Sequence, residues 1–331
     1  MTDSSPLLSV EQLHVAIRND HGISRDMVSG VSFTVAAGET LGLVGESGCG
    51  KSLTAMSILG LLPRPQAGIS GGQVRYRGED LAGASRQRLR TLRSAEIAVI
   101  FQDPMTALNP VHTIGRQVEE VLRLHFPGLK AGDRRQRVLT LLEDVGIPAA
   151  AERVNAYPHQ LSGGMRQRVM IAIALAGEPK LLIADEPTTA LDVTIQAQII
   201  SLLISLQQQR GMGMLFITHD LALVAQLADR IAVMYAGKIV EQQPAEQLFA
   251  SPRHPYTKGL LAALPAAAEQ PKTRLAAMTG QVPGIDQMPT GCRFANRCPH
   301  ADDLCLNTDP ALESFTDGAA VACHHWKKLN D

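Results

Sequence analysis

The sequence predicts an α/β fold built on a parallel sheet and followed by a small, irregular C-terminal segment. From Pro179 to Val240, apolar stretches of strand length alternate with helical patterns. Such alternation indicates a mostly parallel sheet with helices on both faces. After about Ala250 the regular periodicity ends, and proline- and alanine-rich sequence begins. We therefore expect an α/β domain over residues 1–250 and a C-terminal extension over residues 251–331.

Two further subdomains are expected within the first 250 residues. Near the N-terminus, LLSVEQLHVAI, GVSFTVAAGE and GGQVRYRGEDL alternate apolar and polar residues, as half-buried antiparallel strands do. Residues 105–178 contain TIGRQVEEVLRLH and DRRQRVLTLLEDVGI, whose apolar residues recur at helical spacing. This region predicts a helical subdomain, and its basic cluster at residues 134–137 predicts a solvated helix face.

The segment GESGCGKS predicts a phosphate-binding loop. It fits the pattern G-x-x-x-x-G-K-[ST] and lies between a strand, LGLVG, and a helix, LTAMSILGLL. Glycines there let backbone N–H groups surround phosphate oxygens at a helix N-terminus. Lys51 is then expected to reach the β- and γ-phosphates, and the Ser52 hydroxyl to hold Mg²⁺. The expected ATP-binding residues are Gly45, Glu46, Ser47, Gly48, Cys49, Gly50, Lys51 and Ser52.

A second anion-binding helix start is predicted in LSGGMRQR. Ser162, Gly163 and Gly164 form a polar start, poor in side chains, to the helix MRQRVMIAIALA. One nucleotide does not need two such sites from one subunit. We therefore expect this one to contact the γ-phosphate of ATP bound by a partner subunit.

Two acidic residues end the apolar run KLLIADEP, which predicts a buried parallel strand with acids at its C-terminal end. A metal-holding acid beside a water-orienting acid suits phosphoryl transfer, which depends on positioning and charge stabilisation. Together with the phosphate loop and LSGGMRQR, this order of motifs resembles the ATP-binding-cassette (ABC) ATPases.

The resemblance implies a role for each motif residue. Asp185, with Ser52 and Gln102, would hold Mg²⁺, and Glu186 would polarise the attacking water. Gln102 in IFQDP would also sense the membrane partner, and His219 in LFITHD would lie near the γ-phosphate. The segment TTALD resembles the D-loop, which reaches the partner's site through Ala190, Leu191 and Asp192.

Recognition of the adenine base is the weakest element of the pattern. ABC ATPases stack adenine on an aromatic residue upstream of the phosphate loop, but residues 14–27 contain no Phe, Tyr or Trp. Ile17, His21 or Arg25 could cover the base instead, Arg25 by stacking its guanidinium group.

Longer phrases are similar to the ATP-binding subunits of bacterial dipeptide and oligopeptide importers, the peptide and nickel importer group. They are IFQDPMTALNP, YPHQLSGGM, ADEPTTALDVTIQAQII, SPRHPYT and the cysteine-containing tail. This resemblance implies ATP hydrolysis that powers peptide uptake, at the cytoplasmic face of the inner membrane. It implies as partners a second, related ATPase subunit, two membrane-spanning permeases and, indirectly, a periplasmic substrate-binding protein.

Other functions stay open at this stage. The solute could be nickel or another metal chelate, a murein peptide or an opine, because the ATPase subunit never touches it. A soluble ABC ATPase of DNA repair or translation is a remote alternative, since the chain lacks sustained heptads. The formal net charge of −1 also argues against a nucleic-acid partner. No apolar run of membrane-spanning length and no secretory signal are apparent, so we expect a cytoplasmic chain.

Four of the five cysteines lie close together near the C-terminus, and the fifth, Cys49, lies in the phosphate loop. Clustered thiols in a cytoplasmic chain favour a metal site over disulfides. The spacing C-x5-C-x6-C-x17-C lacks the close pairs of most zinc sites. The importer resemblance implies a 4Fe–4S cluster, while zinc and unligated thiols remain alternatives. The expected ligands are Cys292, Cys298, Cys305 and Cys323, with His300, His324 and His325 as spare donors.

The role of the C-terminal metal site is expected to be local. A metal there would replace a hydrophobic core in a segment with little periodic apolar sequence. Loss of the metal should therefore loosen this segment and largely spare the phosphate loop, which belongs to the preceding domain.

Overall fold

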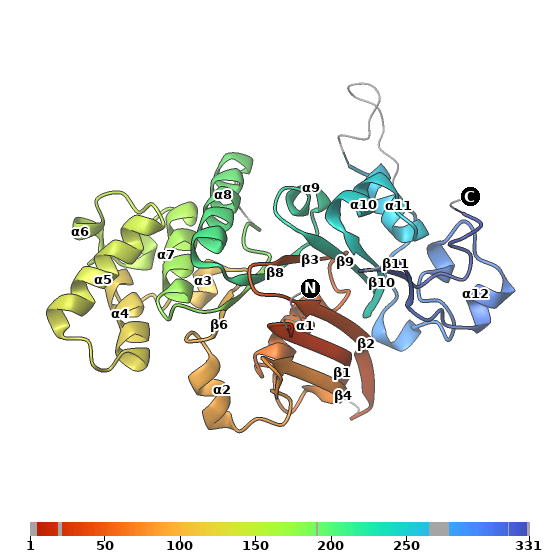
Figure 1. Cartoon of the computed structure of the whole chain (residues 1–331), viewed down its shortest axis with the longest axis horizontal. Helices are drawn as coiled ribbons and strands as arrows, with labels where there is room; N and C mark the ends of the chain where they lie inside the picture. The colour runs from red at the N-terminus through yellow and green to blue at the C-terminus, as the bar shows by residue number, and fades with distance from the viewer. Residues whose placement is uncertain (1–4, 19–21, 190, 265–277, 317, 330–331) are drawn as a thin grey trace. The chain divides into compact units, whose positions relative to one another are not determined.

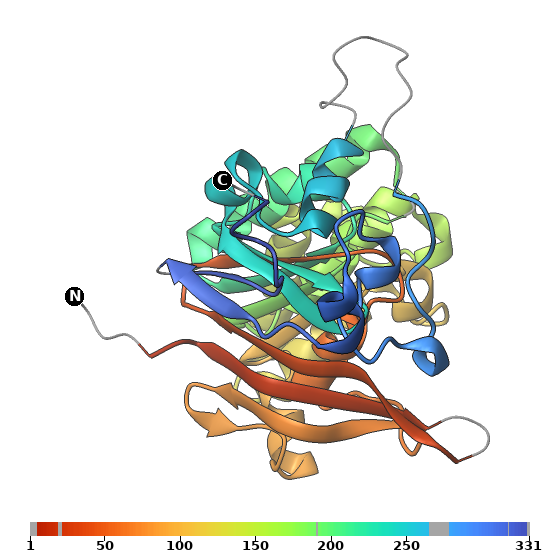
Figure 2. The ribbon, with the colours of Figure 1, turned by 90° about the vertical axis from the view of Figure 1, so that its right-hand side faces the viewer.

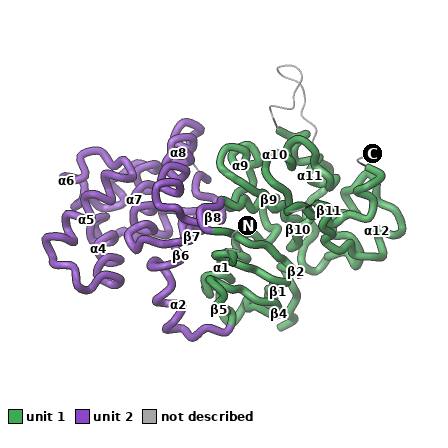
Figure 3. The backbone as a smooth tube through the Cα atoms, viewed as in Figure 1, with its two compact units in different colours: residues 1–36, 40–82, 216–331 green, residues 37–39, 83–215 purple. Residues whose placement is uncertain are grey.

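The computed structural model describes residues 5–18, 22–189, 191–264, 278–316 and 318–329. The chain forms two compact units, shown in Figures 1 and 3. The first unit contains residues 1–36, 40–82 and 216–331, and the second contains residues 37–39 and 83–215. The chain thus leaves the first unit after residue 82 and returns to it at residue 216.

An antiparallel sheet forms the N-terminal part of the first unit. Its strands lie in the order β2-β1-β4-β5, and Figure 2 shows the three long strands side by side. Leu8 and Val10, and then Leu13 and Val15, are buried in β1, with an irregularity of the strand between the two pairs. The predicted alternation is thus confirmed on each side of that irregularity. The strands are β1 (Leu8–Arg18), β2 (Ser24–Val35), β4 (Ala67–Tyr76) and β5 (Glu79–Asp80).

The second sheet of this unit combines parallel and antiparallel strands. β3 (Thr40–Val44) and β9 (Arg230–Tyr235) are parallel and almost fully buried, as expected for uninterrupted apolar strands. β10 (Lys238–Pro244) pairs antiparallel with β9. Two strands of the C-terminal segment, β12 (Ala319–Val321) and β11 (Glu313–Thr316), extend this sheet beyond β10. The sequence predicts only irregular structure there, because strands this short carry no readable alternation.

The helices of the first unit are mostly short. α1 (Lys51–Ile58) packs against β1 and β4. The segment LALVAQLAD predicts a nine-residue helix, but only α9 (Leu221–Val224) is helical. The C-terminal part of the unit contains α10 (Ala245–Ala250), α11 (Pro255–Ala262), α12 (Asp303–Asn307) and the 3₁₀ turns η3 (Ile285–Gln287) and η4 (Ala295–Arg297).

The second unit joins two parallel strands to a group of helices. β6 (Ile97–Ile100) and β7 (Leu181–Asp185) pair in parallel, and β8 (Gly213–Thr218) begins in this unit. Both amphipathic segments predicted as helices form, as α4 and α5. In the basic cluster of α5, Arg135 is exposed, whereas Arg134 and Arg137 are half-buried. The helices are α2 (Arg86–Leu92), α3 (Pro104–Ala107), α4 (Ile114–His125), α5 (Ala131–Asp144), α6 (Ala150–Arg153), η1 (Pro158–Gln160), α7 (Gly163–Leu175) and α8 (Val193–Arg210).

One helix joins the helical group to the strands. α7 contacts both α4 and α5 and also contacts β6. These elements confirm the predicted α/β class. Within the described residues, no helix combines the length and the apolar character needed to cross a lipid bilayer.

Candidate functional site

The phosphate loop lies between β3 and α1, as the sequence predicts. Lys51 is buried, and its Nζ donates hydrogen bonds to the carbonyl oxygens of Gly45 at 2.7 Å and Glu46 at 3.1 Å. Gly50, directly before the helix, has φ of 104°, which favours glycine. The loop therefore presents a buried ammonium group beside the N–H groups at the start of α1, an arrangement suited to phosphate.

Gly45 cannot be replaced without moving the backbone. A Cβ at this position would lie 2.1 Å from the carbonyl oxygen of Met234. We expect Gly45→Ala to abolish nucleotide binding and to destabilise the fold by about 1–3 kcal/mol, the usual cost of overpacking. Titration with a fluorescent ATP analogue and thermal unfolding would measure both effects. Gly68→Ala is the matched control, because a Cβ there meets no atom within 4 Å. Normal binding by Gly45→Ala would contradict this account of the loop.

The second unit brings Gln102 and Glu186 together. Asp185 is buried at the end of β7, and Glu186 follows it with a left-handed φ of 46°. This conformation costs a non-glycine residue about 1–2 kcal/mol. The Glu186 Oε2 accepts hydrogen bonds from Gln102 Nε2 at 3.1 Å and from Thr189 Oγ1 at 3.0 Å. Two donors thus fix this carboxylate; the sequence predicts Gln102 as a site residue but not Thr189.

The start of α7 lies beside the start of α8, within the same unit. Ser162 caps α7 by accepting a hydrogen bond from the Met165 N–H at 3.4 Å, and it is exposed together with Gly163. A Cβ on Gly164 would come within 2.7 Å of Ile195 in α8, so this glycine permits the close approach. The start of α7 is therefore exposed to solvent at Ser162 and Gly163.

The residues before α8 lie next to this helix start. A Cβ on Gly163 would lie 3.7 Å from Leu191, and Asp192 caps α8 by accepting from the Ile195 N–H at 2.9 Å. Ala190 lies outside the described residues. Leu191 of TTALD thus lies next to the LSGGM segment in the second unit.

The remaining predicted nucleotide residues belong to the first unit. His219 is exposed directly after β8. Ile17 and Arg25 face each other across β1 and β2, and Arg25 Nε pairs with Asp286 Oδ1 at 2.9 Å. His21 lies outside the described residues. The structure therefore keeps Ile17 and Arg25 as candidates for contact with the base, with Arg25 already ion-paired.

The four C-terminal cysteines line one pocket of the first unit. Its other polar lining side chains are His254, His300, His324 and His325. Burial raises the pKa of Cys292 to about 11, and it also raises the pKa of the other three thiols. Neutral thiols are thus favoured until a cation enters. This donor set fits a soft metal such as zinc or iron.

A smaller group at the edge of this pocket was not predicted as a unit. One ligand atom each from Asp302, Cys305 and His325 lie within 4.8 Å of one another. Asp302 accepts from the Cys305 N–H at 3.1 Å, and this bond is the main cause that lowers the pKa of Asp302 to about 2. His325 Nε2 lies 3.0 Å from the Asp302 carboxylate. The sequence predicts His325 as a spare metal ligand, but no sequence pattern predicts Asp302 as one.

Comparison with known proteins assigns the family. Residues 28–189 match the ABC transporter family. The chain is 51% identical over 319 residues to the dipeptide transport ATP-binding protein DppD of Escherichia coli (strain K12), covering 96% of both chains. The chain belongs to the ABC transporter family. Residues 240–305 of this ABC protein also match the C-terminal region of oligopeptide and dipeptide transporters.

Other similar proteins agree with this assignment. The DppD protein of Haemophilus influenzae is 50% identical over 318 residues, covering 96% of this chain and 95% of its own length. The dimeric structure of a bacterial ABC transporter cassette is similar with a TM-score of 0.64 and 26% identity. It covers 72% of this chain and 98% of its own. The cbiO1 structure from Clostridium perfringens has a TM-score of 0.63 and 29% identity, over 75% of this chain and 92% of its own. The predicted ABC ATPase fold is therefore confirmed.

Proposed function

We propose that this ABC protein is the ATP-hydrolysing subunit of an importer that takes up dipeptides or oligopeptides. One observation carries the proposal: a single chain matches both the ABC transporter family and the C-terminal region of peptide transporters. Relatives that are 50% and 51% identical over nearly the whole chain are named dipeptide transport ATP-binding proteins. The same C-terminal match argues against an ABC ATPase of DNA repair or translation.

Uptake measurements test this function directly. The chain, its permeases and its binding protein would be reconstituted in vesicles containing ATP, and uptake of a radiolabelled dipeptide measured. We expect uptake that unlabelled dipeptides compete away and that a Lys51→Ala variant abolishes. Uptake of a nickel chelate, a murein peptide or an opine in place of dipeptides would overturn the peptide assignment and identify the alternative solute.

The nucleotide residues are proposed to divide the chemistry among them. Residues 45–52 would hold the phosphates, with Lys51 supplying charge and Ser52, Gln102 and Asp185 holding Mg²⁺. Glu186 would polarise the attacking water, and His219 would assist at the γ-phosphate. The hydrogen bonds from Gln102 and Thr189 support this role of Glu186, because they orient its carboxylate.

The chain is proposed to act in a pair of ATPase subunits, the second being a related but distinct chain. The exposed starts of α7 and α8 support this pairing, since Ser162, Gly163 and Gly164 offer N–H donors outward. A similar cassette has a dimeric structure. Two permeases would attach the pair to the cytoplasmic face of the inner membrane, and a periplasmic binding protein would supply the solute.

This assembly predicts that the isolated chain is a poor ATPase. One subunit alone lacks the second helix start that would contact its own γ-phosphate. We expect phosphate release to be close to background for the purified chain and to appear when the partner ATPase and permeases are added. A steady-state assay over a wide range of protein concentration measures this. Fast, cooperative hydrolysis by the monomeric chain at low concentration would contradict the proposal.

Residues 251–331 are proposed as an extension with a metal site, following an ABC ATPase domain at 1–250 whose helical subdomain spans about 105–178. Cys292, Cys298, Cys305 and Cys323 would hold a 4Fe–4S cluster. All four thiols line one pocket of the first unit. Their sequence spacing, C-x5-C-x6-C-x17-C, lacks the close pairs of most zinc sites and so favours a larger inorganic core.

Zinc remains the alternative occupant for a specific reason. The compact group of Asp302, Cys305 and His325 offers the sulfur, nitrogen and oxygen donors that zinc accepts. Metal analysis of protein purified without oxygen distinguishes the two, because a cluster would give iron and sulfide and the alternative would give zinc.

A further inference from the structure

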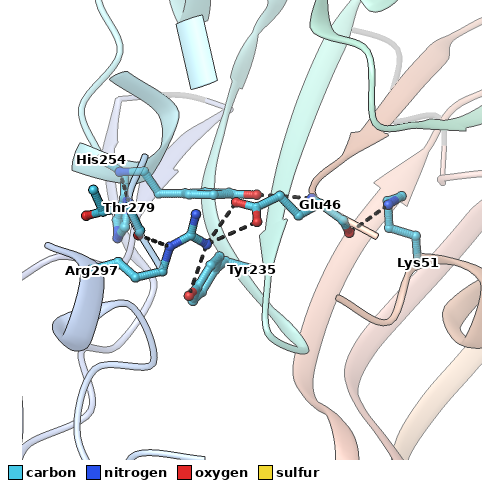
Figure 4. Close-up of polar contacts among 7 residues, drawn as sticks. Glu46, Lys51, Tyr235, His254, Thr279 and Arg297 are labelled. Carbon is cyan, nitrogen blue, oxygen red and sulfur yellow. Dashed lines mark hydrogen bonds and ion pairs between the residues drawn. The ribbon is translucent and has the colours of Figure 1, made fainter. Parts of the chain in front are cut away.

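The phosphate loop is held by a side chain from the C-terminal extension. Arg297 Nη1 donates to both carboxylate oxygens of Glu46, at 2.9 and 3.1 Å (Figure 4). The Arg297 side chain is only 5% exposed, and that of Glu46 is 30% exposed. A charge pair this sheltered from water is screened far less than a surface pair. The two residues are 251 positions apart in the sequence.

Arg297 is itself fixed from several sides. Its Nε donates to the carbonyl oxygen of Thr279 at 3.0 Å. Its guanidinium group lies over the rings of Tyr235 and Phe294, 5.6 and 5.9 Å from their centroids. These contacts hold the guanidinium group in one place, so little side-chain entropy is lost when it binds Glu46.

A second residue holds the backbone of the same loop position. The Tyr256 hydroxyl accepts a hydrogen bond from the Glu46 N–H at 3.1 Å. Tyr256 is fully buried, and burial raises the pKa of its phenol, which keeps the hydroxyl neutral. Its ring packs against Tyr235 at 4.7 Å and Phe294 at 5.4 Å between centroids. Glu46 is therefore held at both its side chain and its main chain.

The segment that carries Tyr256 is anchored by buried polar groups. Burial lowers the pKa of His254 to about 3, so this histidine is neutral, and its Nδ1 accepts from the Tyr256 N–H at 3.0 Å. The buried Glu241 carboxylate accepts from the N–H groups of Arg253 at 2.6 Å and His254 at 2.9 Å. These hydrogen bonds fix the backbone around Tyr256, and so they fix the position of its hydroxyl group beside the loop.

Glu46 links this support to the lysine of the loop. Its carbonyl oxygen accepts the hydrogen bond from Lys51 Nζ at 3.1 Å, which Figure 4 shows beside the Arg297 contact. On the other side, Arg297 directly precedes Cys298, and Phe294, which packs on Tyr256, follows Cys292 by two residues. The supporting residues therefore belong to the same short segment as two of the four thiols.

We propose that Arg297 and Tyr256 are positioning residues for the phosphate loop, so that an ordered cysteine-bearing segment is needed for tight ATP binding. The proposal rests on the proposed function of the loop in binding ATP. It differs from the expectation, drawn from the sequence, that loosening the C-terminal segment would largely spare the phosphate loop. The physical reason is the half-buried ion pair between Arg297 and Glu46, which no local sequence pattern predicts.

A double-mutant cycle on ATP affinity tests the proposal. The full-length chain and its Arg297→Ala, Glu46→Ala and doubly substituted variants would be titrated with a fluorescent ATP analogue in the presence of Mg²⁺. We expect each single substitution to raise the Kd about tenfold, which corresponds to about 1.4 kcal/mol. The double variant should be no weaker than the single ones, because all three lose the same contact.

Controls separate positioning from general stability. Asp309→Asn removes a different ion pair, between Lys238 of β10 and the C-terminal segment, and should lower the thermal midpoint without changing the Kd. Tyr256→Phe removes only the hydroxyl and keeps the packing, so it tests the second contact even where Arg297→Ala folds poorly. It should raise the Kd by a smaller factor. The kcat of the assembled transporter at saturating ATP should change less than its KM.

Several results would overturn the proposal. Unchanged affinity in both Arg297→Ala and Tyr256→Phe would do so, as would fully additive effects of the Arg297 and Glu46 substitutions. An equal loss of affinity in Asp309→Asn would show that general stability is responsible. Failure of the unsubstituted chain to bind the analogue would instead count against the proposed ATPase function, which keeps the two ideas distinguishable.

Discussion

Replacing Glu186 with glutamine is expected to lower ATP turnover of the assembled transporter by about 10²- to 10⁴-fold, the usual contribution of general base catalysis. The substitution keeps the shape of the side chain and an oxygen that can accept from Gln102 and Thr189. It removes only the negative charge that would polarise the attacking water. ATP binding should therefore persist, and the subunits should accumulate as an ATP-bound closed pair.

Two measurements check this expectation. Steady-state phosphate release gives the turnover, and gel filtration with ATP gives the amount of closed pair. Glu178→Gln is the matched control, since Glu178 is an exposed carboxylate of the same unit that pairs with Arg137. It should hydrolyse ATP normally. Turnover by Glu186→Gln at the rate of the unsubstituted complex would remove Glu186 from the proposed mechanism.

Local motifs explain why much of the candidate site could be predicted from the sequence. The phosphate loop needs a strand, a glycine-rich turn and a helix in direct succession, so its residues and its geometry are encoded together between Leu41 and Ile58. The helix caps Ser162 and Asp192 are equally local, because each side chain bonds an N–H three residues ahead. Helices with strong amphipathic periodicity, such as α4 and α5, were predictable for the same reason.

Contacts between segments that are distant in the sequence could not be predicted, because no local motif encodes them. The pairing of β12 with β10 joins residues about 80 positions apart, and β12, with three residues, is too short to show an alternating pattern. The ion pair between Glu46 and Arg297 links the phosphate loop to the C-terminal segment through two residues that look ordinary in sequence. Asp302 likewise becomes a candidate ligand only because the fold brings His325 beside it.

These contacts change what the C-terminal segment is expected to do. Its sequence has little apolar periodicity and predicts a metal in place of a core. The structure also packs Phe294 against Tyr235 and Tyr256, two fully buried residues of the first unit. The segment therefore shares a core with the elements around the phosphate loop, and loss of the proposed metal is expected to affect that loop.

The second large effect is expected from replacing single cysteines in the C-terminal pocket. Full-length protein purified without oxygen should be brown and contain about four iron and four sulfide per chain, as for one 4Fe–4S cluster. Cys298→Ser should remove the iron and the colour. It should also loosen the segment, because ligand binding and local folding are linked. Since Arg297 precedes Cys298, the affinity for ATP should fall, as is also expected for Arg297→Ala.

Two variants sharpen this experiment. His300→Ala changes a pocket residue outside the proposed ligands and should keep its iron. Asp302→Asn removes the oxygen donor of the compact group with Cys305 and His325, and it should also keep iron if four thiolates hold the cluster. If the protein instead contained stoichiometric zinc, and Asp302→Asn lost it, the site would be a mixed-donor zinc site and not an iron–sulfur cluster. Finding neither metal in protein prepared without oxygen would overturn both metal assignments and leave four neutral thiols, the state that their raised pKa values favour when no cation is bound.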